Sequence, residues 1–265
     1  MNDKNNTTDS GLSGLFSVAP DKQVRFAPGN LQYQASTGTW RFAERQYDCI
    51  GQANSNIGQK NDDWIDLFGW GTAGWMNGAK VFQPWGNSTL FDDYHTGGSP
   101  MSDLVGTFAE ADWAWHNAIV GGGDKPHLWR TPTAEEWRYL LTERPAAREK
   151  FGTATVAGVH GLVVLPDGWT QPKGLDFTPG LNGWEANYFP TKAWQQMEQA
   201  GALFLPATGN RVGTNVGSVG EEGRYWSTTH KDRNCAVVVN FGPAALMTAD
   251  FGYRNGGFAV RAIKE

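Results

Sequence analysis

The sequence predicts an α+β protein that is rich in loops, with short antiparallel sheets and about two helices. Three observations support this class. Glycine occurs 34 times in 265 residues, and glycine is a strong marker of turns and loops. Apolar residues alternate with polar ones over runs of a few residues, as they do in half-buried strands. The spacing of an amphipathic helix occurs in two segments, at residues 133–141 and 191–200.

Composition and charge limit the kind of partner. Hydrophobic residues make up 40% of the chain, which is enough for a core, and charged residues make up 18%, below the usual share of about 25%. The net charge of −5 argues against a nucleic acid or an anionic membrane as the partner. No apolar run approaches the roughly 20 residues that span a bilayer, so we expect no membrane insertion by this chain.

The first residues differ in composition from the rest. Residues 1–10 are polar and lack the basic and then apolar pattern of a signal peptide. We expect residues 1–13 to be a disordered leader or the remnant of a linker. Residues 14–265 are expected to form a single domain, because no linker, repeat or low-complexity break follows. A signal or lipoprotein segment removed from an upstream position stays open.

The first part of this domain predicts a meander of short strands. Alternating apolar residues at 24 and 26, at 31 and 33, and at 40 and 42 are separated by turn sequences at residues 28–30 and 36–38. Residues 62–74 are rich in Trp and Gly, and they predict a packed loop that covers the core. Residues 77–100 carry several Pro, Gly and Asn breakers and predict further loops.

The clearest helix begins at Thr133. Thr133 and Glu136 have the spacing of a capping box, in which each side chain binds a free backbone N–H of the other residue. Trp137, Leu140 and Leu141 follow at the three-and-four spacing of one buried face. Pro145 ends this pattern.

The remaining elements alternate between strands and one more helix. Residues 161–165 and 202–205 are continuous apolar runs and predict buried strands. A second helix is expected over residues 191–200, with Trp194 and Met197 facing inward and Gly201 as its C-terminal cap. A Gly-rich loop is expected to end at Gly223. The last strands are predicted at residues 225–228, 236–241 and 258–263.

The C-terminal stretch has two constant-looking borders, residues 223–228 and 257–261, around a segment of unusual composition. All 13 Trp residues lie at or before Trp226. Residues 229–256 contain no Glu or Gln, and only one Lys and one Met. A β-hairpin that is rich in small residues and lacks Trp by chance is the alternative explanation.

This pattern resembles the variable region of diversity-generating retroelement proteins, which are binding proteins with a C-type-lectin fold. In that family, adenine-directed mutagenesis rewrites Asn codons and never produces Trp, Lys, Met, Gln or Glu. The resemblance therefore implies that Lys231 and Met247 belong to the constant framework.

Two further stretches carry related resemblances. Residues 128–137, LWRTPTAEEW, look like the R-L-P-T-E-x-E-W signature of the formylglycine-generating-enzyme superfamily, which has a C-type-lectin-like core. The block at residues 17–51 is similar to the N-terminal part of large Bacteroidetes-type surface proteins with the same lectin-like domain. The resemblances imply a C-type-lectin-like fold of the formylglycine-generating-enzyme variant. They also imply display on a cell surface or a phage particle.

The superfamily contains enzymes, and their sites are not found in this chain. The copper-dependent oxidase needs a cysteine pair near its C-terminus, whereas Cys49 and Cys235 lie far apart and outside such a motif. The sulfoxide synthase uses a three-His iron site. Here the histidines are scattered without a helical metal-ligand spacing, at His95, His116, His127, His160 and His230. We expect no catalytic residues, no metal ligands and no cofactor.

Calcium-dependent sugar binding is also disfavoured. The triplets Glu-Pro-Asn and Gln-Pro-Asp and the sequence Trp-Asn-Asp, which calcium-binding lectins use, do not occur. The acidic clusters at residues 62–66 and 92–93 lack the order of an EF-hand loop. A purely structural calcium ion stays open.

The predicted function is ligand binding without catalysis, through a variable surface on a rigid scaffold. Phe251 and Tyr253 are the expected anchors, because rigid aromatic side chains give contact area at low entropic cost. Val237 and Val238 are neighbours, so only one of them can face a ligand on a regular strand. The candidate ligand-binding residues are Thr229, His230, Asp232, Asn234, Cys235, Val237, Val238, Asn240, Gly242, Ala245, Thr248, Asp250, Phe251, Gly252, Tyr253, Asn255 and Gly256.

The framework around them is assigned by the same resemblance and by suitability for burial. It comprises Trp226, Ala236, Val239, Phe241, Leu246, Arg254, Phe258, Val260 and Arg261.

The small and apolar character of the candidate surface favours a protein ligand over a carbohydrate. Two alternative functions stay open. The chain could be an enzyme of the formylglycine-generating-enzyme superfamily, or an invariant surface-adhesion domain of the same fold that is never diversified.

Overall fold

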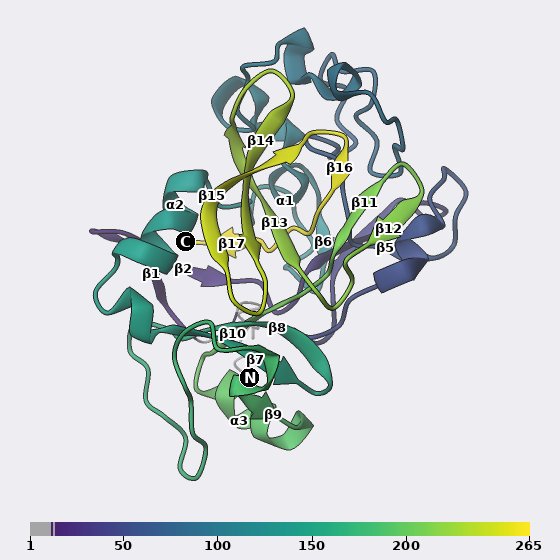
Figure 1. The fold of residues 1–265 in the computed structure, drawn as a ribbon. Coiled ribbons are helices and arrows are strands. Elements are labelled where there is room, and N and C mark those ends of the chain that lie inside the picture. Colours follow the sequence, from purple (N-terminus) through teal and green to yellow (C-terminus); the bar gives the residue numbers. More distant parts are fainter. Residues whose placement is uncertain (1–11, 13) are drawn as a thin grey trace, which may run out of the picture.

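A computed structural model describes Leu12 and residues 14–265 (Figure 1). Its strands are short and form small, mostly antiparallel sheets, and its helices are few, which confirms the α+β class. The leader predicted at residues 1–13 lies outside the described residues except for Leu12. That side chain is buried, and its backbone N–H donates to the Phe26 carbonyl at 2.9 Å.

The N-terminal strands are present, but they do not form one meander. Strands β1 (Phe16–Ala19) and β2 (Lys22–Phe26) pair with each other, and β2 also pairs with the last strand, β17 (Ile263–Lys264). Strands β3 (Leu31–Gln34) and β4 (Thr39–Phe42) form a hairpin in a different sheet. Strands β2 and β3 do not pair with each other because the C-terminal segment lies beside both ends of the turn at residues 28–30. Ala27 N donates to Ala262 O, and Leu31 N donates to Val260 O.

The middle of the chain is mostly loop, as predicted. Strands β5 (Trp64–Ile65) and β6 (Ile119–Val120) complete the β5-β3-β4-β6 sheet. Leu67, Phe68 and Trp70 are fully buried, so the Trp- and Gly-rich loop does pack into the core. Short helical turns occur at η1 (Gly51–Ser55), η2 (Phe91–Tyr94), η3 (Thr96–Gly98), η4 (Gly106–Ala111) and α1 (Trp113–His116).

Helix α2 (Ala134–Arg138) begins as the sequence predicts. The Thr133 hydroxyl accepts a hydrogen bond from Glu136 N at 3.2 Å, and the Glu136 carboxylate accepts one from Thr133 N at 2.9 Å. The helix continues as a π-turn, η5 (Tyr139–Glu143), so that Trp137, Leu140 and Leu141 are all buried. The capping box and the buried face are therefore confirmed.

A sheet formed by β7 (Phe151–Val156), β8 (Val159–Val164), β9 (Tyr188–Phe189) and β10 (Leu203–Pro206) lies with helix α3 (Thr191–Gln199) in the lower part of Figure 1. Helix α3 packs its buried Trp194 and Met197 against this sheet. Gly201 follows the end of the helix and has a φ of 95°. These features confirm the second predicted helix and its cap. The sheet has the order β10-β8-β7-β9. Short turns η6 (Ala147–Glu149) and η7 (Trp184–Ala186) flank it.

The Gly-rich loop predicted before Gly223 contains a hairpin. Strands β11 (Asn210–Val212) and β12 (Asn215–Gly217) pair with each other, and β11 also pairs with β16 (Gly256–Gly257). Strands of three residues show almost no alternation of apolar and polar side chains. The third strand of this sheet, β16, comes from far along the chain. Local sequence therefore does not reveal them.

The C-terminal sheet has the order β13-β14-β15, with strands β13 (Gly223–His230), β14 (Cys235–Phe241) and β15 (Leu246–Tyr253). The sequence predicted the first two strands and missed β15. The strand predicted at residues 258–263 is wrong except at Ile263. This segment crosses between sheets, and its backbone pairs in turn with Phe68, Arg224 and Arg130 instead of following one neighbour.

Both faces of this sheet are covered over part of their length. Trp226, Ala236, Val238 and Phe258 belong to one core cluster, and Tyr225, Val239 and Phe241 belong to a second one with Trp137. All the framework residues assigned from sequence are buried except Leu246, which is half-buried. Lys231 and Met247 are exposed, so packing does not explain why they would be constant.

Candidate binding surface

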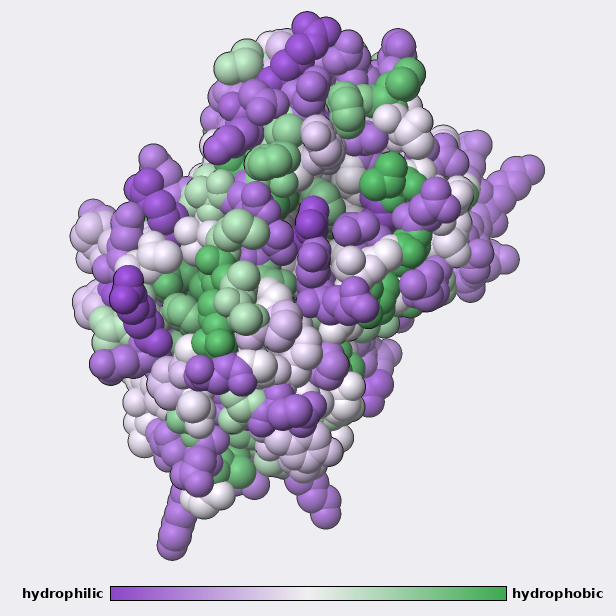
Figure 2. All heavy atoms as spheres, in the orientation of Figure 1, coloured by the Kyte–Doolittle hydropathy of each residue, from purple (hydrophilic) through white to green (hydrophobic). Residues whose placement is uncertain are grey.

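A hollow of about 480 Å³ lies between the β13–β14 turn and the end of β15. It is lined by Lys231, Asp232, Arg233, Asn234, Cys235, Phe251 and Tyr253. Figure 2 shows apolar residues gathered over β14 and β15 on this face, with hydrophilic residues around them. The hollow thus combines an apolar wall on the sheet with a charged rim on the turn.

The apolar wall is a row of aromatic rings. Tyr253 stacks on Phe91 with centroids 4.8 Å apart, and Phe251 meets Tyr253 edge to face at 6.1 Å. Phe251 and Tyr253 remain 49% and 50% exposed. Since half of each ring is already packed, both rings are held in place while they offer apolar area to a partner.

The register of the sheet decides between the two neighbouring valines. Val237 lies opposite Phe251 and Val238 lies opposite Asp250, on the other face. Val238 is fully buried in the core, while Val237 is 7% exposed beside the aromatic row. Val238 is therefore wrong as a ligand-contacting residue.

Gly252 is also wrong as a ligand-contacting residue. It points away from the hollow, and a Cβ added there would lie 2.3 Å from the ring of Phe258 and 3.0 Å from Val238. Asn255 and Gly256 are also wrong as ligand-contacting residues, because both are buried. The Asn255 side chain is buried and donates to Thr89 O at 2.8 Å, and Gly256 is buried in β16.

The structure places the other predicted residues in three regions. Around the hollow lie Asp232, Asn234 and Cys235. At the end of β13 lie Thr229 and His230. The remaining candidates lie either at the opposite end of the sheet or on its other face, and these are Gly242, Ala245, Thr248, Asn240 and Asp250. The candidate set therefore does not form one continuous patch.

The β13–β14 turn is held partly by the Asp232 carboxylate, which accepts from Asn234 N at 2.8 Å and from Cys235 N at 2.9 Å, and partly by groups outside the hollow. Arg254 binds two of its carbonyls, donating from Nη2 to Asp232 O at 3.1 Å and from its backbone N to Asn234 O at 3.0 Å. The carbonyl of Arg233 accepts a hydrogen bond from His95 Nε2 at 2.8 Å. Three successive carbonyls thus have partners that do not depend on the side chains of the turn.

The one thiol beside the hollow is poorly suited to nucleophilic chemistry. Burial raises the pKa of Cys235 to about 11, so the side chain is a neutral thiol near pH 7. Cys49 and Cys235 are both free. Across the described part of the chain, no three His, Cys, Asp or Glu side chains are arranged to hold a metal ion.

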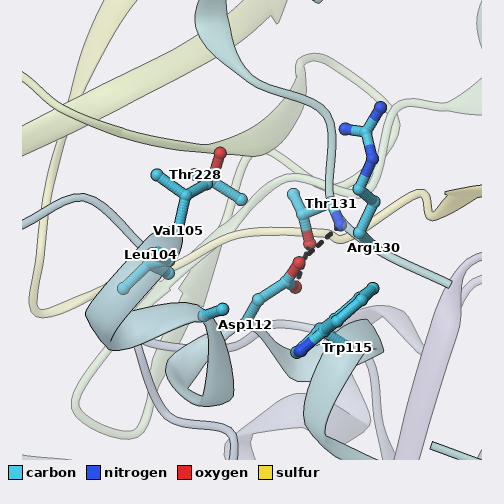
Figure 3. Close-up of a pocket in the computed structure, with 9 residues that line it drawn as sticks. Leu104, Val105, Asp112, Trp115, Arg130, Thr131 and Thr228 are labelled. Carbon is cyan, nitrogen blue, oxygen red and sulfur yellow. Dashed lines mark hydrogen bonds between the residues drawn. The ribbon is translucent and has the colours of Figure 1, made fainter. Parts of the chain in front are cut away.

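A second hollow, of about 240 Å³, was not foreseen from the sequence. We call it the Trp115 pocket. It is lined by Leu104, Val105, Gly106, Ala109, Asp112, Trp115, Arg130, Thr131 and Thr228. Figure 3 shows Leu104 and Val105 on one side of Asp112 and Trp115 on the other. These residues come from loops, from short helical turns and from β13, so no periodic pattern marks them.

Asp112 lies at the base of the Trp115 pocket with its oxygens fully engaged. One oxygen accepts from Thr131 N at 2.7 Å, and the other accepts from the Thr131 hydroxyl at 2.6 Å and from Ala114 N at 3.1 Å. Burial raises the pKa of Asp112 to about 6, although these donors favour the ionised form. Its hydrogen bonds join the start of α1 to the segment before α2.

The raised pKa of Asp112 predicts a pH-dependent stability. Its pKa exceeds the ordinary value of 3.8, so the folded state binds this proton more tightly than the unfolded state. The contribution to the free energy of unfolding is therefore largest below pH 4 and falls, by about 2–3 kcal/mol, as the pH rises to 6. The stability difference between wild type and Asp112→Asn should fall over this range in urea unfolding. A difference that stays flat between pH 4 and pH 6 contradicts the prediction.

Comparison of the chain with protein-family models, curated proteins and solved structures found no match. Among the described residues, no helix has the length and apolar character needed to cross a membrane.

Proposed function

We propose that this chain is a non-catalytic binding protein with a C-type-lectin-like fold, whose C-terminal segment a retroelement diversifies to change its specificity. The observation that carries the proposal is the pair Phe251 and Tyr253, which are half-exposed beside a hollow on the edge strand β15. The unusual composition of residues 229–256 supports the diversification.

A protein is the ligand that this surface suits. The aromatic row is apolar, and exposed large aromatics are typical of protein interfaces. The turn adds Lys231, Asp232 and Arg233 at the rim, so both signs of charge can contact a partner. Polar groups that could order a sugar are few on the sheet side of the hollow.

The way the turn is held is compatible with replacement of its side chains. Arg254 and His95 bind carbonyl oxygens, which every amino acid supplies. A substitution at Asn234 or Asp232 therefore leaves these bonds in place, and a substitution at Asp232 removes the two bonds that its carboxylate accepts from Asn234 N and Cys235 N. Trp70 likewise binds a backbone carbonyl, on β13: its indole N–H donates to Ser227 O at 3.1 Å.

Sequencing the gene from sibling clones tests the diversification. We expect the differences to be concentrated between codons 229 and 256, to arise at adenines of a near-copy template, and to spare codons 238, 252 and 256. Those three residues are buried, and new side chains there would collide with the core. Differences spread evenly along the chain would refute the proposal.

A displayed library tests the binding. Positions 232, 234, 251 and 253 are randomised together, and the library is selected against purified lysozyme. The matched control randomises exposed positions 76, 90, 188 and 212, which lie outside the hollow. We expect binders from the first library only, and equal yields from both libraries would contradict the proposed surface.

A further inference from the structure

The Trp115 pocket lies beside the variable segment but belongs to the constant part of the chain. Every residue that lines it precedes Thr229. Thr228 is part of both the pocket and β13. The pocket therefore adjoins Thr229 and His230 at the end of β13, and the proposed diversification would leave its lining the same in every variant.

The pocket and the variable strand are physically joined. Leu104 N donates to Thr228 O at 2.8 Å, and the Asp103 carboxylate accepts from His230 N at 2.7 Å. The wall formed by Leu104 and Val105 is thus fastened to β13 at two points.

The charged residues of the pocket are already occupied. All the hydrogen bonds of Asp112 described above go to groups of this chain. The guanidinium of Arg130 extends away from Asp112 in Figure 3 and makes two bonds of 2.6 Å to the Glu136 carboxylate. Neither charge is offered to a ligand, so the pocket favours a neutral and apolar group.

Shape and size favour an aromatic ring. The pocket volume of about 240 Å³ exceeds the roughly 150 Å³ of an apolar cavity that holds benzene. The indole of Trp115 packs against His127, with centroids 4.7 Å apart, which holds its plane in position. Val105, on the opposite wall, is 47% exposed. A flat ring inserted between the two would cover both surfaces.

We propose that the Trp115 pocket receives an aromatic side chain of the protein target, as a constant subsite next to the variable surface. This inference rests on the proposed function. The two sites would then have different roles. The pocket supplies a contact common to all variants, and the hollow by Phe251 and Tyr253 selects among targets that present a suitable ring.

The test uses capped amino acids as probes for a side chain on a peptide backbone. N-acetyl-phenylalaninamide is titrated into the full chain, and binding is followed by the NMR shifts of the amides of residues 104–115. We expect saturable binding with a dissociation constant of about 1–10 mM, and no saturation with N-acetyl-asparaginamide. Equal shifts from the two probes, or none from the phenylalanine probe, would overturn the inference.

Two exposed valines provide a matched pair of variants. Val105→Ala removes part of the wall and should weaken the phenylalanine probe about threefold to fivefold. Val120→Ala, at a residue of similar exposure outside the pocket, should leave the affinity unchanged. Ala109→Phe should abolish binding by filling the space, with circular dichroism to confirm folding. Equal losses in both valine variants would show that the probe binds elsewhere.

The inference and the proposed function can fail separately. Probe binding that survives Phe251→Ala/Tyr253→Ala, together with evenly spread differences among sibling clones, would leave the pocket standing without the variable surface. Clustered differences without probe binding would leave the variable surface standing without the pocket.

Discussion

Replacing Gly252 with alanine is expected to lower the free energy of unfolding by about 3 kcal/mol. The added methyl group would lie 2.3 Å from a ring carbon of Phe258 and 3.0 Å from Val238. The Phe258 ring cannot move aside easily, because it is buried and packs on Trp226 with centroids 4.7 Å apart. Relief would require β15 to shift away from the core, and that shift would disturb its pairing with β14. Urea unfolding of the purified variant measures the effect.

The neighbours of Gly252 are the natural controls. Phe251→Ala and Tyr253→Ala remove side chains that are about half exposed, so each should cost at most about 1 kcal/mol. These two variants should stay folded and lose binding, while Gly252→Ala should lose stability. The prediction fails if all three variants unfold at the same urea concentration, because the alternation of β15 would then not separate a binding face from a core face.

The second large effect is expected for Arg261→Met, at about 4 kcal/mol. Arg261 is fully buried, and its guanidinium joins three separate parts of the chain. It donates to Asn30 Oδ1 at 2.9 Å, to Phe204 O at 2.9 Å, and to the carbonyls of Ala27 and Gln46 at 3.2 Å and 3.3 Å. Methionine fills a similar volume but leaves these acceptors buried without donors.

Burial of Arg261 also has an electrostatic cost. The pKa of its guanidinium is lowered to about 10 by burial, so the group stays charged at neutral pH while its acceptors are carbonyl and amide oxygens. The Met variant removes that cost, which is why we expect a loss smaller than the sum of the hydrogen bonds.

Arg41→Met is the matched control for Arg261→Met. Arg41 is half-buried, bonds to Gln32 at 2.9 Å and stacks on Trp64 at 3.8 Å, so its loss should cost about 1 kcal/mol or less. Thermal or urea unfolding of the two variants compares them directly. A loss below about 1 kcal/mol for Arg261→Met would show that the acceptors find other partners, most simply water.

Both predictions concern how the scaffold holds its C-terminal segment. Arg254 and Trp70 contact that segment through backbone carbonyls, and Arg261, which follows it, binds carbonyls of other segments. Gly252 and Val238 occupy core positions within it. The proposed diversification requires contacts of this kind, since every amino acid supplies the backbone carbonyl.

Features encoded within a few neighbouring residues were predicted correctly from the sequence. The capping box at Thr133 and Glu136, the buried face at Trp137, and the glycine after α3 each depend on local spacing. Phe251 and Tyr253, the anchors expected from the sequence, share a face of β15 because side chains two residues apart on a strand point the same way.

Tertiary structure alone decided which of the two buried valines, Val237 and Val238, lies on the same face as Phe251, because that depends on the register between β14 and β15. It also decided the pairing of β11 with β16, the bonds from Arg261 to residues near the start of the chain, and the Trp115 pocket. Each of these joins segments that are far apart in sequence. Such contacts leave no periodic signal in either segment, since the free energy that selects them comes from packing and hydrogen bonds formed only when the chain is folded.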